Sequence, residues 1–231
     1  MNTNKTILRG ELILPLVVLM NSFGVVLMLY SGTGISAISS MTYALSEVLP
    51  AFSLGTWTYI FQSFLILSLM VLRKKFVPQY FFSFGVGFAF GFMVDVYKEW
   101  MQMLPTAVPF RIFYFFMSYL IISVGVALSN RCKMPLIPTD LFPRELAEIT
   151  GVAFSRIKVS FDLICVVTTA GLTIAFLGGI SGLGIGTLLS ALTMGKAIGV
   201  IGTWMDRHIV FVTHQMRHHT GHRSGRRLRL A

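Results

Sequence analysis

The chain has 231 residues, of which 55% are hydrophobic and only 12% are charged, and its mean hydropathy is +0.75. Soluble domains carry roughly 25% charged residues, so this chain has too few charges to cover a soluble core. The net charge of +10 could suggest nucleic acid, but in a membrane protein it more often reports which segments face the cytoplasm. We expect a polytopic membrane protein with no nucleic-acid partner.

Stretches without Asp, Glu, Lys or Arg mark the membrane spans. A window of about 19 apolar residues is the signature of a transmembrane helix. The sequence predicts six such spans, at residues 12–30, 55–72, 78–103, 109–130, 157–177 and 185–205. Two short helices are predicted between spans one and two and between spans four and five, at residues 35–48 and 138–150.

Two segments of the chain match each other at an offset of 101 residues. Ser22–Leu27 and Ser123–Leu128 share the pattern S-x-G-V-x-L, and a short helix follows each of them. Further matching pairs are Phe61 with Phe161, Gln62 with Asp162, Gly91 with Gly195, Trp100 with Trp204 and Met101 with Met205. We interpret the chain as two repeats, 1–105 and 106–206, followed by a tail, 207–231. Because each repeat has an odd number of spans, the second is expected to be inverted relative to the first.

Lys and Arg residues indicate the orientation in the membrane. With the N-terminus in the cytoplasm, 16 of the 19 Lys and Arg residues fall in cytoplasmic segments. Lys98 and Arg111 then fall outside, and Lys196 falls within a span. Since Lys-rich and Arg-rich loops stay in the cytoplasm, both termini are expected there.

The tail, residues 207–231, is rich in basic residues. It contains all five histidines of the chain and six arginines. Basic residues near a membrane surface attract anionic lipid headgroups, at about 1 kcal/mol each. We therefore expect the tail to bind anionic lipid. His214 and His218 have the i,i+4 spacing of metal ligands, but we predict no metal site.

Each short helix begins with residues that can cap it. Capping groups are Ser36, Ser39 and Ser40 in the first, and Pro138, Thr139 and Asp140 in the second. Within lipid, broken backbone is tolerated only where it is buried in protein or lines a wet cavity. Inverted-repeat transporters aim the N-termini of such half-helices at a midplane site. The alternative is a pair of amphipathic helices on the membrane surface, which remains open for 36–46 and is favoured for 140–150.

Asp95, Asp162 and Lys196 are the charged residues that we place inside the predicted spans, whereas Lys98, Glu99, Arg111 and Lys158 are assigned to their ends. A charge at the bilayer centre costs about 2.5–3.5 kcal/mol on insertion scales, so such a residue is expected to face a cavity or a partner. Spans three and six are expected to meet, with Asp95 and Lys196 paired. Alternatively, Asp95 is solvated at the outer surface, and Asp162 pairs with Lys158 one helical turn away.

These considerations define a predicted substrate site and exclude catalysis. The predicted substrate-binding residues are Ser36, Ser39, Ser40, Gln62, Asp95 and Lys196, with Trp57, Thr139, Asp140 and Asp162 as secondary candidates. Trp57 could equally belong to the aromatic belt at the membrane surface. Gly179–Gly182 resembles the serine motif of intramembrane proteases, but every histidine lies in the tail. Without a histidine in any span to act as the base, Ser181 is expected to be a loop residue, and no enzyme activity or cofactor is predicted.

Several segments also carry a family resemblance through their order and spacing. They are Gly34–Ser40, Leu54–Thr58, Arg73–Phe76, Phe90–Asp95, Lys158–Asp162 and Gly186–Thr187. Together they resemble the YczE/YyaS/YitT family of small bacterial membrane proteins, over most of residues 10–205. The family pattern favours a proline where Ala37 stands, and a glycine-rich and acidic stretch where Leu136–Leu141 stands. The resemblance implies a multi-pass protein of the bacterial inner membrane with a role in transport, and it names no substrate.

Two hypotheses for the function follow. The first is a small-solute secondary transporter with a cavity between the repeats, in which Asp95 would allow coupling to protons. The second is a non-transporting membrane module that binds a ligand or a partner, like the substrate-binding component of an energy-coupling ABC importer. Such components usually have alanines on their first helix, and span one has none. A channel is disfavoured by the scarcity of charged rings. The chain could be a monomer or a homodimer.

Overall fold

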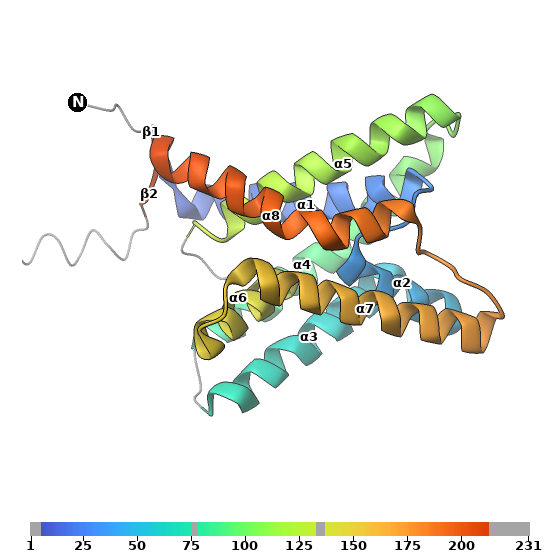
Figure 1. The fold of residues 1–231 in the computed structure, drawn as a ribbon, viewed down its shortest axis with the longest axis horizontal. Helices are drawn as coiled ribbons and strands as arrows, with labels where there is room; N and C mark the ends of the chain where they lie inside the picture. The colour runs from blue at the N-terminus through green and yellow to red at the C-terminus, as the bar shows by residue number, and fades with distance from the viewer. Residues whose placement is uncertain (1–5, 75–77, 133–136, 213–231) are drawn as a thin grey trace, which may run out of the picture.

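The computed structural model describes residues 6–74, 78–132 and 137–212, which form a bundle of eight α-helices (Figure 1). They are α1 (Gly10–Tyr30), α2 (Ala37–Val48), α3 (Leu54–Arg73), α4 (Pro78–Trp100), α5 (Val108–Ser129), α6 (Pro138–Thr150), α7 (Phe154–Leu177) and α8 (Ile185–His208). All except α2 and α6 are long and apolar enough to cross a membrane. The predicted fold class, an all-α polytopic membrane protein, is confirmed.

Three short elements complete the described chain. A turn of 3-10 helix, η1 (Met101–Met103), extends α4. Strand β1 (Thr6–Arg9) pairs in parallel with strand β2 (Ile209–Val212). The segments that precede α1 and follow α8 therefore lie side by side (Figure 1). Ser181 lies in the loop between α7 and α8, as predicted.

The ends of the helices agree only in part with the predicted caps. Gly151 ends α6 in the left-handed conformation, at φ +70°, where glycine has no Cβ to clash. At the starts, the prediction was less accurate. Ser36 is the N-cap of α2, but its side chain makes no capping hydrogen bond. The N-cap of α6 is Ile137, not Thr139 or Asp140, because those two residues are already within its first turn.

Helix packing has the pseudo-two-fold pattern expected of inverted repeats. α1 packs against α5, its own counterpart. The other contacts come in matched pairs: α3 on α4 and α7 on α8, α1 on α4 and α5 on α8, α2 on α7 and α6 on α3, and α2 on α3 and α6 on α7. Each contact therefore recurs when α1 to α4 are exchanged with α5 to α8.

Matched glycines let corresponding helices approach each other closely. A Cβ atom on Gly24 of α1 would lie 2.7 Å from Ile122 Cγ1 of α5, and one on Gly125 would overlap Asn21 Oδ1. The offset of 101 residues carries Asn21 to Ile122 and Gly24 to Gly125, so these contacts are reciprocal. The repeated S-x-G pattern therefore marks the place where the two repeats cross.

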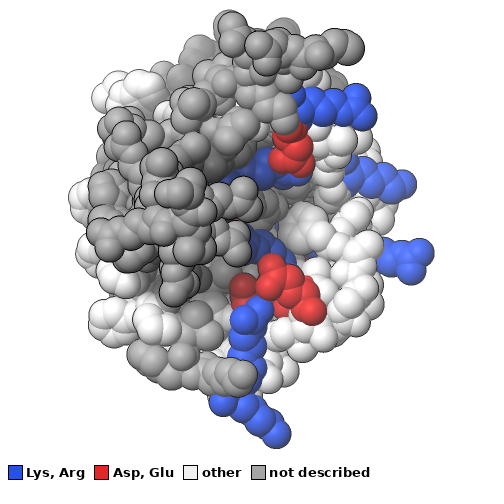
Figure 2. Space-filling model, turned by 90° about the vertical axis from the view of Figure 1, so that its left-hand side faces the viewer, with Lys and Arg blue, Asp and Glu red and all other residues white. Residues whose placement is uncertain are grey.

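Charged residues gather at one end of the bundle, where α3 and α5 end and α7 begins (Figure 2). We call it the basic end, and its arginines are Arg73, Arg131, Arg144, Arg156 and Arg207. Ion pairs join Arg73 to Glu145 at 2.7 Å and Arg131 to Asp206 at 2.7 Å. Lys98 and Arg111 lie toward the other end of the bundle, where α4 ends and α5 begins (Figure 1). Lys5, Lys75, Lys133 and most of the tail, residues 213–231, lie outside the described residues.

Candidate functional site

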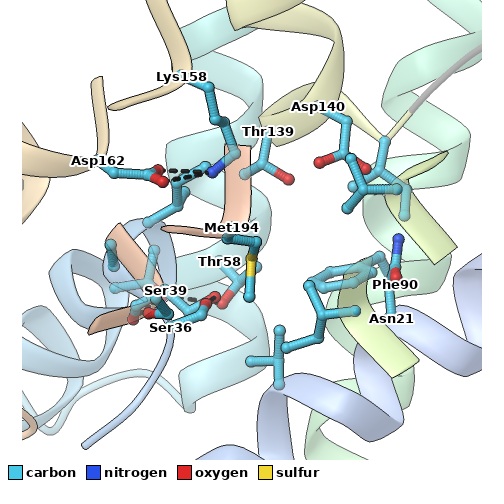
Figure 3. A pocket seen from close by; sticks show the side chains of 18 of the residues that line it. Asn21, Ser36, Ser39, Thr58, Phe90, Thr139, Asp140, Lys158, Asp162 and Met194 are labelled. Carbon is cyan, nitrogen blue, oxygen red and sulfur yellow. Dashed lines mark hydrogen bonds and ion pairs between the residues drawn. The ribbon is translucent and has the colours of Figure 1, made fainter. Parts of the chain in front are cut away.

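A small cavity lies where the two repeats meet, and all eight helices contribute residues to its wall (Figure 3). Its volume is about 50 Å³. Since one water molecule needs roughly 10–15 Å³ on this measure, the cavity has room for a few waters or a small ion. Val25 of α1 and Val126 of α5, an equivalent pair at the offset of 101 residues, both line it. The cavity therefore lies close to the pseudo-two-fold axis.

The first turns of α2 and α6 enter this cavity from opposite repeats. Ser36 and Ser39 come from the start of α2, and Thr139 and Asp140 come from the start of α6. Neither helix has a side-chain N-cap hydrogen bond. The first backbone N–H groups of a helix have no partner within it and carry a partial positive charge. Two such positive ends therefore meet at the cavity, the arrangement predicted for broken helices.

Burial decides between the two readings of the short helices. Asp140, Leu141 and Glu145 of α6 are buried, and so are Ser36 and Ser40 at the start of α2. The surface placement favoured for residues 140–150 is therefore wrong for the first turns of α6, because these pack against α3 and α7 inside the bundle.

One wall of the cavity holds a buried ion pair. Lys158 Nζ donates hydrogen bonds to both carboxylate oxygens of Asp162, at 2.6 and 2.8 Å. The two residues are 4% and 1% exposed. The i,i+4 pairing is thus confirmed, but the pair lies in the cavity wall rather than at a solvated surface. Because a buried pair recovers little more than its desolvation cost, it is weak evidence for stability and stronger evidence for function.

Asp140 is the third ionisable residue of the cavity. It is 5% exposed, and its Oδ2 atom has no hydrogen-bond partner in the structure. Burial raises the pKa of Asp140 to about 7; the positive charge of Lys158 acts in the opposite direction, and the negative charge of Asp162 adds to the rise. In Figure 3, Asp140 lies across the cavity from the Lys158–Asp162 pair, and in this view Thr139 lies between them.

The two repeats contribute different chemistry at equivalent positions. The offset of 101 residues between α2 and α6 aligns Ser39 with Asp140, and the offset of 100 residues between α3 and α7 aligns Thr58 with Lys158 and Gln62 with Asp162. The first repeat therefore supplies neutral polar groups, and the second supplies the three ionisable ones. The cavity is symmetric in architecture and asymmetric in charge.

Five of the ten predicted site residues line the cavity: Ser36, Ser39, Thr139, Asp140 and Asp162. Ser40 and Gln62 are buried nearby but outside it. Ser40 Oγ bonds Thr169 Oγ1 at 2.9 Å, between α2 and α7. The Gln62 amide is buried without a hydrogen-bond partner, and a Cβ on Gly87 of α4 would meet it at 2.6 Å.

The predicted pairing of Asp95 with Lys196 is wrong. Asp95 accepts hydrogen bonds from Ser53 Oγ at 2.6 Å and from Gly55 N at 2.8 Å, so it holds the start of α3. Lys196 is exposed, and no ion pair of the described residues joins it to Asp95. The reason is architectural, because α4 packs mainly on α3 and α1, whereas α8 packs mainly on α5 and α7.

Trp57 also lies outside the cavity. Two residues that line it, Lys158 and Asn21, are not among the predicted site residues. The Trp57 indole Nε1 donates to the Leu49 carbonyl oxygen at 3.1 Å, which ties α3 to the end of α2. The sequence predicts Lys158 only as a partner of Asp162, although the match of Phe61-Gln62 with Phe161-Asp162 makes Lys158 the equivalent of Thr58. Asn21 directly precedes the repeated S-x-G pattern, and that position was the available signal.

Comparison with known proteins gives a family and no further relatives. A model described as a family of unknown function (DUF6198) matches residues 8–203. No curated protein and no solved structure matches the chain. The matched range contains every residue of the cavity wall named above, so the site lies within the part of the chain that defines the family.

Proposed function

We propose that this chain, which belongs to a family of unknown function (DUF6198), is a secondary transporter that moves a small solute through the cavity between its inverted repeats. The observation that carries the proposal is the buried Lys158–Asp162 pair in the wall of that cavity. Ionisable residues inside a membrane protein are expensive, and they commonly mark a substrate or ion pathway.

The cavity suits a small polar solute. Its volume of about 50 Å³ admits a ligand of only a few non-hydrogen atoms in this conformation. The N-termini of α2 and α6 and the hydroxyl groups of Ser39 and Thr139 offer hydrogen-bond donors, whereas the Ser36 hydroxyl donates to Ser39 Oγ at 2.9 Å. Helix N-termini favour anionic groups, so we propose a solute with a negatively charged or strongly hydrogen-bond-accepting group.

Inverted repeats supply a physical route for transport. Two halves with the same architecture and opposite orientation can exchange conformations, which opens a site between them first to one side and then to the other. The glycine contacts between α1 and α5 place little side-chain bulk at the crossing of the repeats. We propose that this crossing is the pivot of the movement.

The cellular location and the orientation in the membrane are also part of this proposal. The resemblance to the YczE/YyaS/YitT family supports a place in the inner membrane of a bacterial cell. The gathering of arginines at the basic end supports a cytoplasmic location for that end and for both termini. The tail would then meet the anionic lipid of the cytoplasmic leaflet.

A second candidate function is a membrane module that binds a partner or a ligand without transport. One observation favours it, an open groove of about 530 Å³ between α5, α6, α7 and α8. Arg131, Arg144 and Phe154 line this groove at the basic end, where a partner protein could dock.

A thermal-shift screen of the purified protein separates the candidates. The wild type is heated with libraries of small solutes between pH 5 and pH 8. Two variants accompany it: Lys158→Thr/Asp162→Gln, which carries the first repeat's residues, and Asp95→Asn, which lies outside the cavity. A solute that stabilises the wild type and Asp95→Asn but not the double variant supports the proposal and permits liposome flux assays. Equal stabilisation of all three would remove the cavity as the site. Stabilisation by a partner protein alone would favour the module.

A further inference from the structure

Asp140 differs from the other buried carboxyl groups of the described residues. These groups belong to Asp140, Glu145 and Asp162. Asp162 is bonded through both oxygens to Lys158, and Glu145 is bonded to Arg73 and to the Tyr80 hydroxyl. Asp140 alone of the three has a buried oxygen with no partner. A buried carboxylate without a partner is costly, so a proton is the simplest ligand that relieves the cost.

The surroundings of Asp140 contain one ion pair and otherwise neutral groups. α6 packs against α3, α7 and α4. From α7, Lys158 and Asp162 face the same cavity. The charged residue of α3 near α6 is Arg73, which pairs with Glu145 and Glu148 at the basic end. From α4, the Tyr80 hydroxyl donates to Glu145. Toward the cavity, α2 and α3 present the hydroxyl groups of Ser39 and Thr58.

We propose that Asp140 is the proton-binding residue of this cavity, and that ionised Asp140 competes with Asp162 for the ammonium group of Lys158. The proton comes from water when the cavity opens on one side and returns to water when it opens on the other. With the proton bound, Asp140 is neutral and Lys158 stays with Asp162. Without it, two carboxylates share one ammonium group. This inference rests on the proposed transport function and gives it a coupling ion.

The electrostatics of the site place the exchange in an ordinary pH range. Burial raises the pKa of Asp140 to about 7, and the positive charge of Lys158 acts in the opposite direction. An anionic solute in the cavity would raise the proton affinity of Asp140 further, because it disfavours the carboxylate. By reciprocity, the proton would raise the affinity for the anion. Proton and anion would therefore enter together.

Infrared difference spectroscopy tests the proton site without any solute. The carbonyl stretching band of a protonated buried carboxylic acid is followed from pH 5 to pH 9 in the purified protein. We expect a band that disappears with a midpoint between about pH 6 and pH 8, in the wild type and in Asp95→Asn. The band is expected to be missing in Asp140→Asn and in Asp140→Ser, where serine is the residue of the equivalent position in the first repeat.

Asp162→Asn provides an additional readout. This change removes the competing carboxylate, so Lys158 can pair with ionised Asp140, and the midpoint of the band should move to lower pH by at least one unit. A purely structural role of Asp140 would not produce that shift.

Two results would overturn the proton site. One is a wild type without a titrating carboxyl band in this range, and the other is a band that survives in both Asp140 variants. Either result would leave the solute screen unaffected, so a failed proton site and a failed transport function can be told apart.

Discussion

Lys158 and Asp162 can be compared with the residues at the equivalent positions of the other repeat. Their equivalents, Thr58 and Gln62, occupy the same places in the architecture without charge. The first repeat packs with neutral residues at these places, so we predict that the bundle can form without the ion pair. Lys158 and Asp162 add one positive and one negative charge to the wall of the cavity.

This comparison predicts the stability of two variants. Asp162→Gln breaks the buried pair and leaves Lys158 with only the carboxyl group of Asp140, on the other side of the cavity, as a partner, so we expect a loss of up to about 3–5 kcal/mol. Replacing both residues, in Lys158→Thr/Asp162→Gln, removes the unpaired charge and should restore most of that stability. Thermal melting in detergent measures both. A double variant no more stable than Asp162→Gln would contradict the interpretation.

The raised pKa of Asp140 predicts that the stability of the folded protein depends on pH. Because its pKa is raised from 3.8 to about 7 in the folded protein, the folded state binds a proton more tightly than the unfolded state. Its contribution is fully present below about pH 4 and is lost as the pH rises through about 7. The melting temperature of the wild type should therefore fall between pH 5 and pH 8 relative to that of Asp140→Asn. Asp95→Asn is the control and should follow the wild type; a parallel fall in Asp140→Asn would contradict the assignment.

Residues near the site were predictable from sequence only where local spacing decided their role. The i,i+4 spacing of Lys158 and Asp162 was sufficient to predict their contact. The pairing of Asp95 with Lys196 depended on which helices pack together, and sequence alone did not determine that. Asp95 instead accepts hydrogen bonds from Ser53 and Gly55. This contact joins α4 to the start of α3 across about 40 residues of sequence, and no spacing in the sequence indicates it.

At the scale of elements, glycine positions determine how closely neighbouring helices pack. α3 and α4 meet where Gly55 and Gly91 face each other, and a Cβ on Gly91 would lie 2.5 Å from the Gly55 carbonyl oxygen. The equivalent contact between α7 and α8 is looser. There, a Cβ on Gly195 would lie 3.4 Å from the Ser155 carbonyl oxygen.

This difference predicts unequal effects of one substitution at equivalent positions. Gly91→Ala should force α3 and α4 apart and cost about 1–3 kcal/mol, as overpacking does. Gly195→Ala should be nearly neutral, because its new methyl group fits at an ordinary contact distance. Melting temperatures of the two variants provide the measurement, and equal losses would show that the two interfaces pack alike.

Helix positions were predicted well, and α6 occupies the predicted residues 138–150. Each span was recognised because apolar length and the absence of charge are properties of one continuous stretch. The burial of the first turns of α2 and α6 was less predictable, because α7 and α3 bury them, and these elements are distant in sequence. Tertiary packing, and not amphipathicity, placed the first turn of α6 inside the bundle.

At the scale of the whole molecule, the inverted repeat was predictable from matched motifs and from the number of spans. The cavity and its uneven charge were not, because they depend on which faces of eight helices converge. The alignment of the repeats still indicated part of the site, since it makes Ser39 equivalent to Asp140 and Thr58 equivalent to Lys158. Those differences between the repeats identify the site better than ionisable residues taken singly.

The proposed orientation makes a prediction for the whole chain. Single cysteines are introduced at Thr106, between α4 and α5, and at Val152, between α6 and α7, after the buried Cys132 and Cys165 are replaced by serine. In intact cells, a membrane-impermeant maleimide should label Thr106→Cys and not Val152→Cys. The reverse pattern would place the basic end outside the cell.

The most direct test of the central claim is whether the cavity opens to both sides of the membrane. Ser39→Cys in the same cysteine-free background places a thiol in the cavity wall. A transporter predicts that the impermeant maleimide modifies it both in intact cells and in inside-out vesicles, whereas Thr106→Cys and Val152→Cys each react from one side only. Modification of Ser39→Cys from a single side would contradict alternating access and leave the protein as a static binding module.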